Sequence, residues 1–483
     1  MKLRQLMADA PCHLVAGEAE VEITSICYDS RKVQKGSLFV AICGFQTDGH
    51  RYIDQAVAAG AAAVAVERDI QAPEGVAVLK SENNRILLAA LAAAFYCHPS
   101  RQFRLIGVTG TNGKTSTTYL LKKILEEDGR KVGLIGTIQN LIGNEVIHAD
   151  HTTPESLELQ ALFAHMAQEG ATDVVMEVSS HALALHRVDY SDFDVAVLTN
   201  LTQDHLDYHK TMTAYRDAKA RLFSMAKDAV LNKDDPVGAY MAGFVKGRKL
   251  FYSLHEGADL WAGDIRMNAE GVWFTLHTRE NAVDAYLHTP GRFSIDNGLA
   301  AAGAARMLGI SLERIAEGLR DVPGVRGRFE PVKSPTGLMT VVDYAHTPDG
   351  LINILKTARE FVTGRIITVF GCGGDRDHDK RPLMGRAAGE GSQYCILTSD
   401  NPRTEDPKAI MREAEVGLKE TGCPYEVVEN RREAIGRAIA LQKAGDLVIV
   451  AGKGHEDYQI FASGTIHFDD VEEVRKVYQE ENK

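Results

Sequence analysis

The stretch that decides the fold is "RLIGVTGTNGKTSTTYLLKKILEE", residues 104–127. Residues 105–109 form a short apolar run with β-branched Ile106, Val108 and Thr109, and they predict a buried strand. A turn with two glycines follows, and apolar residues then recur at helical spacing from Lys114 onward. A strand, a glycine turn and a helix in this order aim backbone N–H groups and a helix N-terminus at one spot. This is the geometry that binds phosphate groups.

The polar residues of the turn indicate how a nucleotide is held. Lys114 is expected to reach the β and γ phosphate oxygens, and the Thr115 hydroxyl to be available to Mg²⁺. The spacing departs from the usual P-loop, because Val108 stands where the first glycine is expected. A plain strand-to-helix turn is the alternative, but it leaves the Gly-Lys-Thr-Ser run unexplained. The predicted phosphate-binding residues are Gly110, Thr111, Asn112, Gly113, Lys114, Thr115 and Ser116.

Length and composition limit the class of protein. The chain has 483 residues, 45% of them hydrophobic and 25% charged, which predicts a globular protein of two to four domains. Its net charge of −12 argues against non-specific nucleic-acid binding. We find no signal peptide and no apolar stretch of membrane-spanning length, so we expect a cytoplasmic protein without a membrane span. Seven scattered cysteines without a C-x-x-C pair favour neither a disulfide framework nor a structural zinc site.

Six apolar runs each end in a polar or glycine-rich cluster, three in the middle of the chain and three near its end. Ligands of parallel sheets bind outside the carboxyl ends of the strands, so these clusters predict two ligand-binding α/β regions. Breaks at 97–103 and 325–333 suggest the boundaries. We therefore predict an α/β protein of three domains. They are residues 1–98, residues 99–328 with a central parallel P-loop sheet, and residues 329–483 with a Rossmann-like fold.

Two clusters in the middle region carry candidate metal ligands. Glu177 ends the run "VVMEVSSH", where a second acid often helps to hold Mg²⁺, although a solvated glutamate is the alternative. "TQDHLDYHK" contains His205 among several acids and imidazoles. A zinc hydrolase would need an upstream H-x-H and a third ligand cluster, so a magnesium role fits His205 better, and a polar surface loop stays open. Lys219 by itself has the pattern of a solvated helix lysine.

A third cluster lies in "LTSDNPRTEDP", residues 397–407. An apolar strand ends there in Asp400, Asn401, Pro402 and Arg403. A planar cation beside an amide suits a carboxylate ligand, and proline would stiffen the turn that aims them. A proline-containing surface turn with an incidental arginine is the alternative.

Several motifs together resemble the Mur ligase superfamily along almost the whole chain. They are "TGTNGKTS", "EVSSH", "NLTQDHLDYH", "DAK" at 217–219, "GRFE" at 327–330 and "DYAHTPD" at 343–349. The shortened phosphate loop is also what that family has. "DSR" at 29–31, "HTTPES" at 151–156 and "DNPR" at 400–403 make the resemblance closest to members that use meso-diaminopimelate.

The resemblance implies an ATP-dependent acid–amino-acid ligase of cytoplasmic peptidoglycan precursor synthesis. It would join meso-2,6-diaminopimelate to UDP-N-acetylmuramoyl-L-alanyl-D-glutamate through an acyl phosphate, releasing ADP and phosphate. The implied cofactors are ATP, Mg²⁺ and a CO₂-derived carbamate on Lys219, and we favour a monomer. Other superfamily ligases, such as the D-alanyl-D-alanine-adding enzyme or folylpolyglutamate synthase, remain alternatives, as does a P-loop switch or motor ATPase.

The resemblance also assigns residues to each ligand. The catalytic residues would be Lys114, Glu177, His205 and Lys219, and the metal ligands Thr115, Glu177, His205 and Lys219. Further nucleotide contacts would be Asn297, Arg328, Asp343 and His346. The UDP-muramoyl peptide would meet Tyr28, Ser30, Gln46, Thr152, Thr153, Ser179 and Arg187, with Leu185 standing where a polar contact is expected. Diaminopimelate would meet Arg376, Asp400, Asn401, Pro402, Arg403, Gly452 and Glu456.

Overall fold

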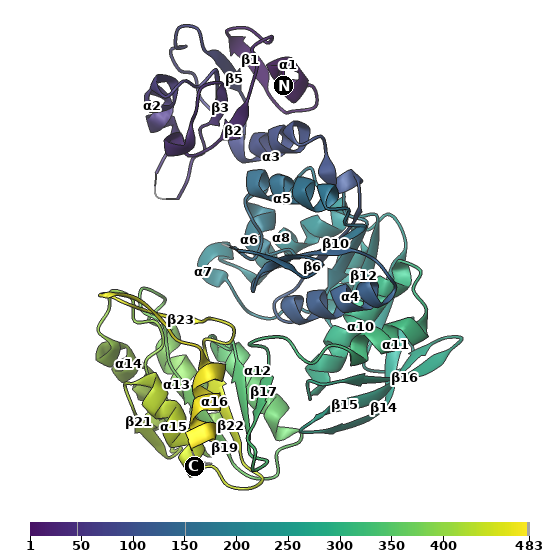
Figure 1. Cartoon of the computed structure of the whole chain (residues 1–483), viewed down its shortest axis with the longest axis vertical. Coiled ribbons are helices and arrows are strands. Elements are labelled where there is room, and N and C mark those ends of the chain that lie inside the picture. The colour runs from purple at the N-terminus through teal and green to yellow at the C-terminus, as the bar shows by residue number, and fades with distance from the viewer. Residues whose placement is uncertain (46, 150, 481–483) are drawn as a thin grey trace. The chain divides into compact units, whose positions relative to one another are not determined.

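The computed structural model describes residues 1–45, 47–149 and 151–480, and it confirms the predicted α/β class (Figure 1). The chain forms two compact units. The first contains residues 1–114 and 125–251, and the second contains residues 115–124 and 252–483. Each unit is described separately below.

The first unit begins with a five-stranded sheet of order β1-β5-β4-β3-β2, parallel except for β1. Side chains alternate across it, so α1 and α3 pack on one face and α2 on the other. The elements are β1 (His13–Ala16), β2 (Ser25–Cys27), β3 (Ser37–Val40), β4 (Ala63–Val66), β5 (Ala77–Lys80), α1 (Leu3–Met7), α2 (Ile53–Ala58), α3 (Asn84–Phe95) and the 3₁₀ turns η1 (Ser30–Lys32), η2 (Gly49–Tyr52) and η3 (Pro99–Arg101).

The rest of the first unit is built on parallel strands in the order β12-β11-β6-β10-β7, continued by antiparallel β8 and β9. The predicted parallel sheet is therefore confirmed, and the carboxyl ends of β6, β10 and β11 meet at one edge. The elements are β6 (Arg104–Thr109), β7 (Val132–Ile135), β8 (Asn140–Ile142), β9 (Glu145–Ile147), β10 (Asp173–Glu177), β11 (Val195–Leu198), β12 (Asp228–Asn232), α5 (Ser156–Gln168), α6 (Ser180–Ala184), α7 (Leu206–His209), α8 (Met212–Met225) and α9 (Pro236–Ala242). Helix α4 (Lys114–Glu127) begins and ends in this unit, whereas its residues 115–124 belong to the second unit.

The second unit begins with an antiparallel meander that the sequence reading did not predict. Burial alternates along β14, which is the pattern of a strand with one covered face. The chain enters this unit within β13 (Lys249–Ser253) and continues through β14 (Leu260–Asn268), β15 (Gly271–Thr278), β16 (Ala282–Leu287), α10 (Arg292–Met307) and α11 (Leu312–Arg320).

The last part of the second unit is a six-stranded sheet of order β17-β18-β22-β19-β20-β21. All its pairs are parallel except β17–β18, and helices cover both faces, α12 to α14 on one and α15 and α16 on the other. This confirms the Rossmann-like prediction. The elements are β17 (Glu330–Lys333), β18 (Met339–Asp343), β19 (Ile366–Phe370), β20 (Tyr394–Leu397), β21 (Tyr425–Val427), β22 (Leu447–Ala451), the hairpin β23 (Tyr458–Phe461) and β24 (Gly464–His467), α12 (Pro348–Arg359), α13 (Lys380–Gly391), α14 (Pro407–Glu420), α15 (Arg431–Leu441) and α16 (Asp470–Glu480).

The strands occupy residues 13–80, 104–287 and 330–467, and the second compact unit includes strands from the last two of these stretches. The predicted domain ranges are 1–98, 99–328 and 329–483. The boundaries themselves stay a prediction.

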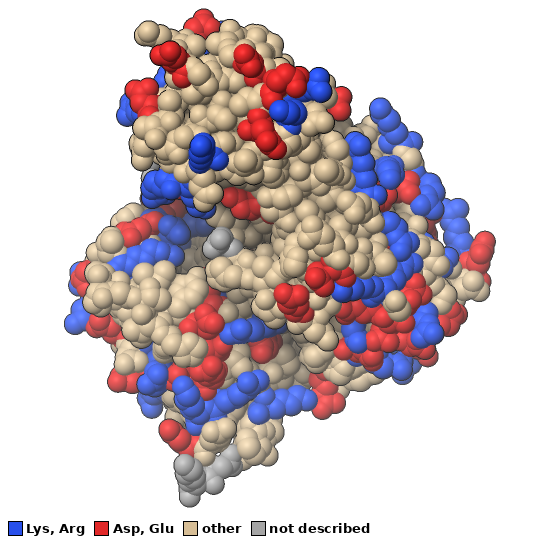
Figure 2. All heavy atoms as spheres, turned by 45° about the horizontal axis from the view of Figure 1, so that its top comes forward, with Lys and Arg blue, Asp and Glu red and all other residues tan. Residues whose placement is uncertain are grey.

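Three further features bear on the class of protein. All seven cysteines lie in the described part of the chain and are free, as expected for a protein without a disulfide framework. Within the described residues, none of the helices combines the length and the apolar character needed to cross a bilayer. On the face drawn in Figure 2, acidic and basic side chains are intermixed. An anionic ligand would therefore depend on local cations.

Candidate active site

The phosphate loop of the first unit is braced by residues that follow β11. Gly110 has to be glycine, because a Cβ there would lie 1.8 Å from the Thr199 hydroxyl oxygen. That hydroxyl donates to the Asn112 carbonyl at 2.6 Å, and the Asn112 N–H donates to the Asn200 side chain at 2.9 Å. Lys114 folds back and donates to the Gly110 carbonyl at 3.0 Å. Sequence reasoning did not single out Thr199 and Asn200, although their place after an apolar strand was a signal.

Lys219 is not the solvated helix lysine that its local pattern suggests. Only 1% of it is exposed, and its Nζ donates to the Gly110 carbonyl at 2.8 Å. The same atom lies 4.7 Å from the centre of the Tyr215 ring. Burial, followed by the charge of Lys114, lowers the pKa of Lys219 well below its usual value. The structure therefore places a buried amine, whose charged form is disfavoured by burial, against the phosphate loop.

Glu177 and His205 are also held at this edge of the sheet. Glu177 is buried at the end of β10, where it accepts the N–H of Thr137 at 2.8 Å and the hydroxyl of the same residue at 3.0 Å. His205 has a left-handed backbone, and its ring centre lies 4.8 Å from that of His181. Burial lowers the pKa of His205 to about 4, so its imidazole is neutral near pH 7. Glu177 is thus not a solvated strand end.

The residues predicted to meet the muramoyl peptide gather next to Glu177. The Thr153 hydroxyl donates to the Glu177 carbonyl at 2.8 Å and accepts the Ser179 N–H at 3.1 Å. Arg187 donates to the Thr153 carbonyl at 3.1 Å, and Thr152 precedes Thr153 in the chain. The structure therefore brings this predicted set together beside the candidate metal ligands.

The predicted uridine contacts lie in the five-stranded sheet region. The Tyr28 hydroxyl donates to Glu158 at 2.8 Å, and burial together with this carboxylate raises the pKa of Tyr28. The Ser30 hydroxyl donates to Gln55 at 3.1 Å. Gln46 lies outside the described residues.

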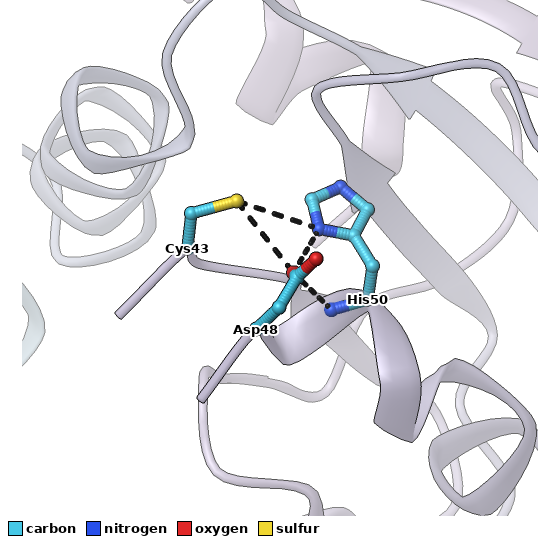
Figure 3. Close-up of side chains that lie close together, drawn as sticks. All are labelled: Cys43, Asp48 and His50. Carbon is cyan, nitrogen blue, oxygen red and sulfur yellow. Dashed lines mark hydrogen bonds and ion pairs between the residues drawn. The ribbon is translucent and has the colours of Figure 1, made fainter. Parts of the chain in front are cut away.

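A cluster in the same region of the chain consists of Cys43, Asp48 and His50, which point toward one another with their ligand atoms within 4.8 Å (Figure 3). The nitrogen Nδ1 of His50 lies 2.7 Å from the Asp48 carboxylate, and the Cys43 sulfur lies 3.6 Å from it. Nε2 of His50 accepts the Glu67 N–H at 3.0 Å, so the ring proton is on Nδ1 and is donated to Asp48. A metal at Nδ1 would require loss of that proton. The arrangement therefore holds the loop rather than a cation.

This assignment predicts unequal effects of two substitutions. His50→Ala should lower the free energy of unfolding by about 2 kcal/mol, because it leaves the partly buried Glu67 N–H without its acceptor and removes the imidazole donor to Asp48. Cys43→Ala, at the exposed end of the cluster, should cost less than about 0.5 kcal/mol. Denaturant unfolding measures both values. A zinc-dependent rise in Tm of the unmodified protein that both variants lose would contradict the assignment.

In the second unit a pocket brings together three of the predicted nucleotide contacts, Ser116, Asn297 and Arg328. Arg328 donates to the Thr115 hydroxyl at 3.2 Å, and its guanidinium lies 4.8 Å from the Tyr344 ring centre. The full lining is Ser116, Leu120, Leu287, His288, Thr289, Phe293, Ser294, Asn297, Val322, Gly324, Val325 and Arg328. A mixed apolar and polar lining of this kind suits a flat heterocycle and its sugar.

Asp343 and His346 are not part of the described lining of this pocket. The two carboxylate oxygens of Asp343 accept the backbone N–H groups of Phe329 at 2.7 Å and Ala345 at 2.8 Å. Burial raises the pKa of Asp343 against the opposing effect of Arg328. His346 is exposed and bonds to the Tyr344 carbonyl at 2.8 Å. In this structure Asp343 braces the turn after β18.

The "DNPR" segment follows β20, and several of its side chains form hydrogen bonds within the protein. Asn401 is buried, its Oδ1 accepts the Ile460 N–H at 3.0 Å, and its Nδ2 donates to Glu456 at 2.9 Å. Lys453, fully buried, donates to the same Glu456 oxygen at 3.1 Å. Asn401 therefore orients Glu456, which differs from the expected role of a ligand-facing amide. Sequence reasoning missed Lys453, although it comes two residues after the end of the buried strand β22.

The remaining predicted residues of this loop region lie as follows. Arg403 has a left-handed backbone and donates from Nη1 to the Gly374 carbonyl at 2.8 Å. Arg376 is exposed and bonds to the neighbouring Asp375 carbonyl. Gly452 packs so closely on Asp400 that a Cβ would lie 2.5 Å from its carboxylate. Pro402 is buried between Asn401 and Arg403. The loops after β19 and β20 thus each carry a cation, Arg376 and Arg403 respectively.

Known proteins share these features. Residues 22–98 match "Mur ligase family, catalytic domain", residues 108–305 "Mur ligase middle domain" and residues 327–454 "Mur ligase, glutamate ligase domain". A curated relative from Caldanaerobacter subterraneus subsp. tengcongensis is 50% identical over 472 residues, covering 98% of both chains. The chain belongs to the Mur ligase family. That relative and one from Alkaliphilus metalliredigens, 47% identical over 100% of this Mur ligase and 98% of its own length, are named UDP-N-acetylmuramoyl-L-alanyl-D-glutamate–2,6-diaminopimelate ligase.

Solved structures agree with the family. A structure of an enzyme with that same name is 33% identical, has a TM-score of 0.73 and covers 100% of this Mur ligase and 99% of its own chain. A MurF ligase from Thermotoga maritima, solved in complex with ADP, is 20% identical with a TM-score of 0.61, covering 95% of this Mur ligase and 98% of its own chain. The second likeness concerns the fold alone.

Proposed function

We propose that this Mur ligase joins meso-2,6-diaminopimelate to UDP-N-acetylmuramoyl-L-alanyl-D-glutamate, using ATP and releasing ADP and phosphate. The observation that carries the proposal is full-length similarity, at 50% and 47% identity, to two relatives with that name. The reaction would take place in the cytoplasm as a step of peptidoglycan precursor synthesis, with the protein acting as a monomer.

The phosphates of ATP would lie on the loop 110–116, with Lys114 on the β and γ oxygens. Asn297 and Arg328 would contact the rest of the nucleotide, because they line the pocket of the second unit. The hydrogen bond that the Thr115 hydroxyl accepts from Arg328 would break when this hydroxyl binds a cation. Asp343 and His346 would support these contacts from the turn after β18.

Mg²⁺ fits part of the donor set directly, because it prefers oxygen ligands such as the Glu177 carboxylate and the Thr115 hydroxyl. His205, neutral as shown above, would complete the set without adding positive charge. A charged lysine would not fit, whereas a carbamate on Lys219 would. The uncharged Nζ would attack the carbon of CO₂, forming an N–C bond and releasing one proton to solvent, so that a neutral amine would become an anionic oxygen ligand. When bound, the metal neutralises phosphate charge and aligns the phosphate oxygens.

The chemistry would run through an acyl phosphate. The D-glutamyl side-chain carboxylate, held by Thr152, Thr153, Ser179 and Arg187, takes the γ-phosphoryl group of ATP, and ADP leaves. The amine of diaminopimelate then attacks the acyl carbon, and the tetrahedral intermediate loses phosphate to give the amide. Protein side chains supply alignment and charge neutralisation rather than covalent steps. Tyr28, Ser30 and Gln46 would anchor the uridine end.

A phosphate-release assay with a panel of amino acids tests this proposal. We expect ATP alone, or ATP with either second substrate, to give little phosphate, and the complete set to give sustained release with diaminopimelate. A switch or motor ATPase would instead release phosphate without the muramoyl dipeptide. Equal release with and without that substrate would therefore refute the ligase assignment.

A further inference from the structure

Two loops at the carboxyl edge of the six-stranded sheet are joined to each other by several hydrogen bonds. One loop, residues 371–377, follows β19, and the other, residues 398–405, follows β20. The Gly374 N–H donates to the Asn401 carbonyl at 2.9 Å, and the Thr404 hydroxyl donates to Asp375 at 2.6 Å. The loops carry Arg376 and Arg403 respectively. Their separation thus sets the spacing of the two arginines.

A carboxylate that the proposed function does not use completes this connection. Glu405 follows the "DNPR" segment and accepts the N–H of Asp375 in the other loop. Both of its oxygens also receive the guanidinium of Arg381, at 2.8 Å and 3.0 Å, in the paired geometry that fixes direction as well as distance. The hydrogen bonds from Arg381 lower the pKa of Glu405 to about 2.

Arg381 is placed to hold both loops at once. It lies at the start of α13, and its side chain is only 1% exposed. Besides Glu405 it reaches the Gly373 carbonyl at 3.4 Å, so one guanidinium contacts each loop. Removal of the paired bonds to Glu405 would leave part of this buried guanidinium without acceptors, which is costly because its charge cannot return to water. The position of the second loop is therefore tied to Glu405.

The same arginine has a second carboxylate that serves as an internal comparison. Glu413, on α14, accepts a hydrogen bond from Arg381 at 2.9 Å, and the same carboxylate lies 3.0 Å from Nδ1 of His378. Glu413 belongs to neither loop. Glu405 and Glu413 thus both pair with Arg381, but Glu405 lies in the second loop and Glu413 lies on α14. Loss of charge can be separated from loss of loop position by changing them one at a time.

We propose that Glu405, through Arg381, is a positioning residue for amino-acid recognition, because it holds the loops of Arg376 and Arg403 at the spacing that binds the distal carboxylate of the substrate. This inference rests on the proposed function, which assigns those two arginines to diaminopimelate. Glu405 itself would not touch the substrate.

The test compares Glu405→Gln with Glu413→Gln in the full-length enzyme. Glu405→Gln keeps the shape of the side chain but removes its charge and the paired hydrogen bonds to Arg381. The KM for diaminopimelate should therefore rise about 30-fold, because displacing a binding group by about 1 Å can cost on the order of a hundredfold. The KM values for ATP and the muramoyl dipeptide should change less than about twofold, because only the binding of diaminopimelate is weakened. Glu413→Gln should leave all three within about twofold.

Arg381→Lys provides a second arm, because an ammonium cannot make the paired bonds. It should reproduce the Glu405→Gln effect, and the double variant should be no worse than either single one. Equal effects of Glu405→Gln and Glu413→Gln, or a rise in KM for all substrates together, would show a merely structural role and overturn the inference. If the unmodified enzyme uses a different amino acid, the proposed function fails, and the same comparison is read with that amino acid.

Discussion

Replacing Lys219 by alanine is expected to lower kcat for ligation by at least about 10³-fold while the protein stays folded. The side chain is buried against the phosphate loop, and burial lowers its pKa well below the usual value, which favours the uncharged amine that reacts with CO₂. Its loss removes the proposed oxygen ligand of Mg²⁺. Initial rates and Tm, measured on the same preparations, give the two readouts.

Rescue by small molecules separates a carbamate from a plain amine at this position. Propionate should restore part of the activity of Lys219→Ala, since a carboxylate replaces the lost oxygens in the space left by the side chain. Ethylamine should not. Lys227→Ala is the control, because Lys227 is exposed and pairs with Asp194 at the surface. Full activity of Lys219→Ala in CO₂-depleted buffer would end the carbamate proposal.

Arg403→Ala is expected to remove most of the preference for meso-diaminopimelate over L-lysine. The two amino acids differ by one distal carboxylate, and a guanidinium left without that partner gives discrimination on the order of 10⁴-fold in the unmodified enzyme. The bond from Nη1 of Arg403 to the Gly374 carbonyl aims this guanidinium. In the variant, kcat/KM for diaminopimelate should fall by about 10³-fold, mainly through KM, and approach the value for lysine.

Two control variants define what Arg403 contributes. Arg403→Lys keeps the charge but loses the planar pair of donors, so it should retain only part of the preference. Arg412→Ala, on the exposed face of α14, should leave both amino acids unaffected. Comparable kcat/KM for diaminopimelate and lysine in the unmodified enzyme would show that "DNPR" does not read the distal carboxylate.

Features set by neighbouring residues could be predicted from the sequence. The strand, glycine turn and helix around Lys114 follow from local periodicity and from backbone angles that glycine tolerates. Glu177 could be placed near the same spot because parallel strands end at one edge of a sheet. The Rossmann-like fold of the last region followed from the same reasoning, since its strands alternate with helices at short spacing.

The antiparallel meander was not predicted. Strands β14 to β16 pair antiparallel in a protein whose other strands are mostly parallel, and their alternating burial depends on which face the rest of the unit covers. An alternation of polar and apolar residues over a short segment does not indicate which other strand that segment will pair with. Strand order is a property of distant segments.

What the sequence determined by itself is therefore the set of local elements and the chemistry of the residues at their ends, because backbone preference and hydrophobic period act over a few residues. The tertiary structure decided burial and partnership. Lys219 lies 109 residues from Gly110 in the chain, and only their contact removes the amine from water and lowers its pKa. Asn401 is committed to Glu456 across 55 residues, and Arg381 to Glu405 across 24. Desolvation and hydrogen bonding depend on these distant neighbours, which no local pattern contains.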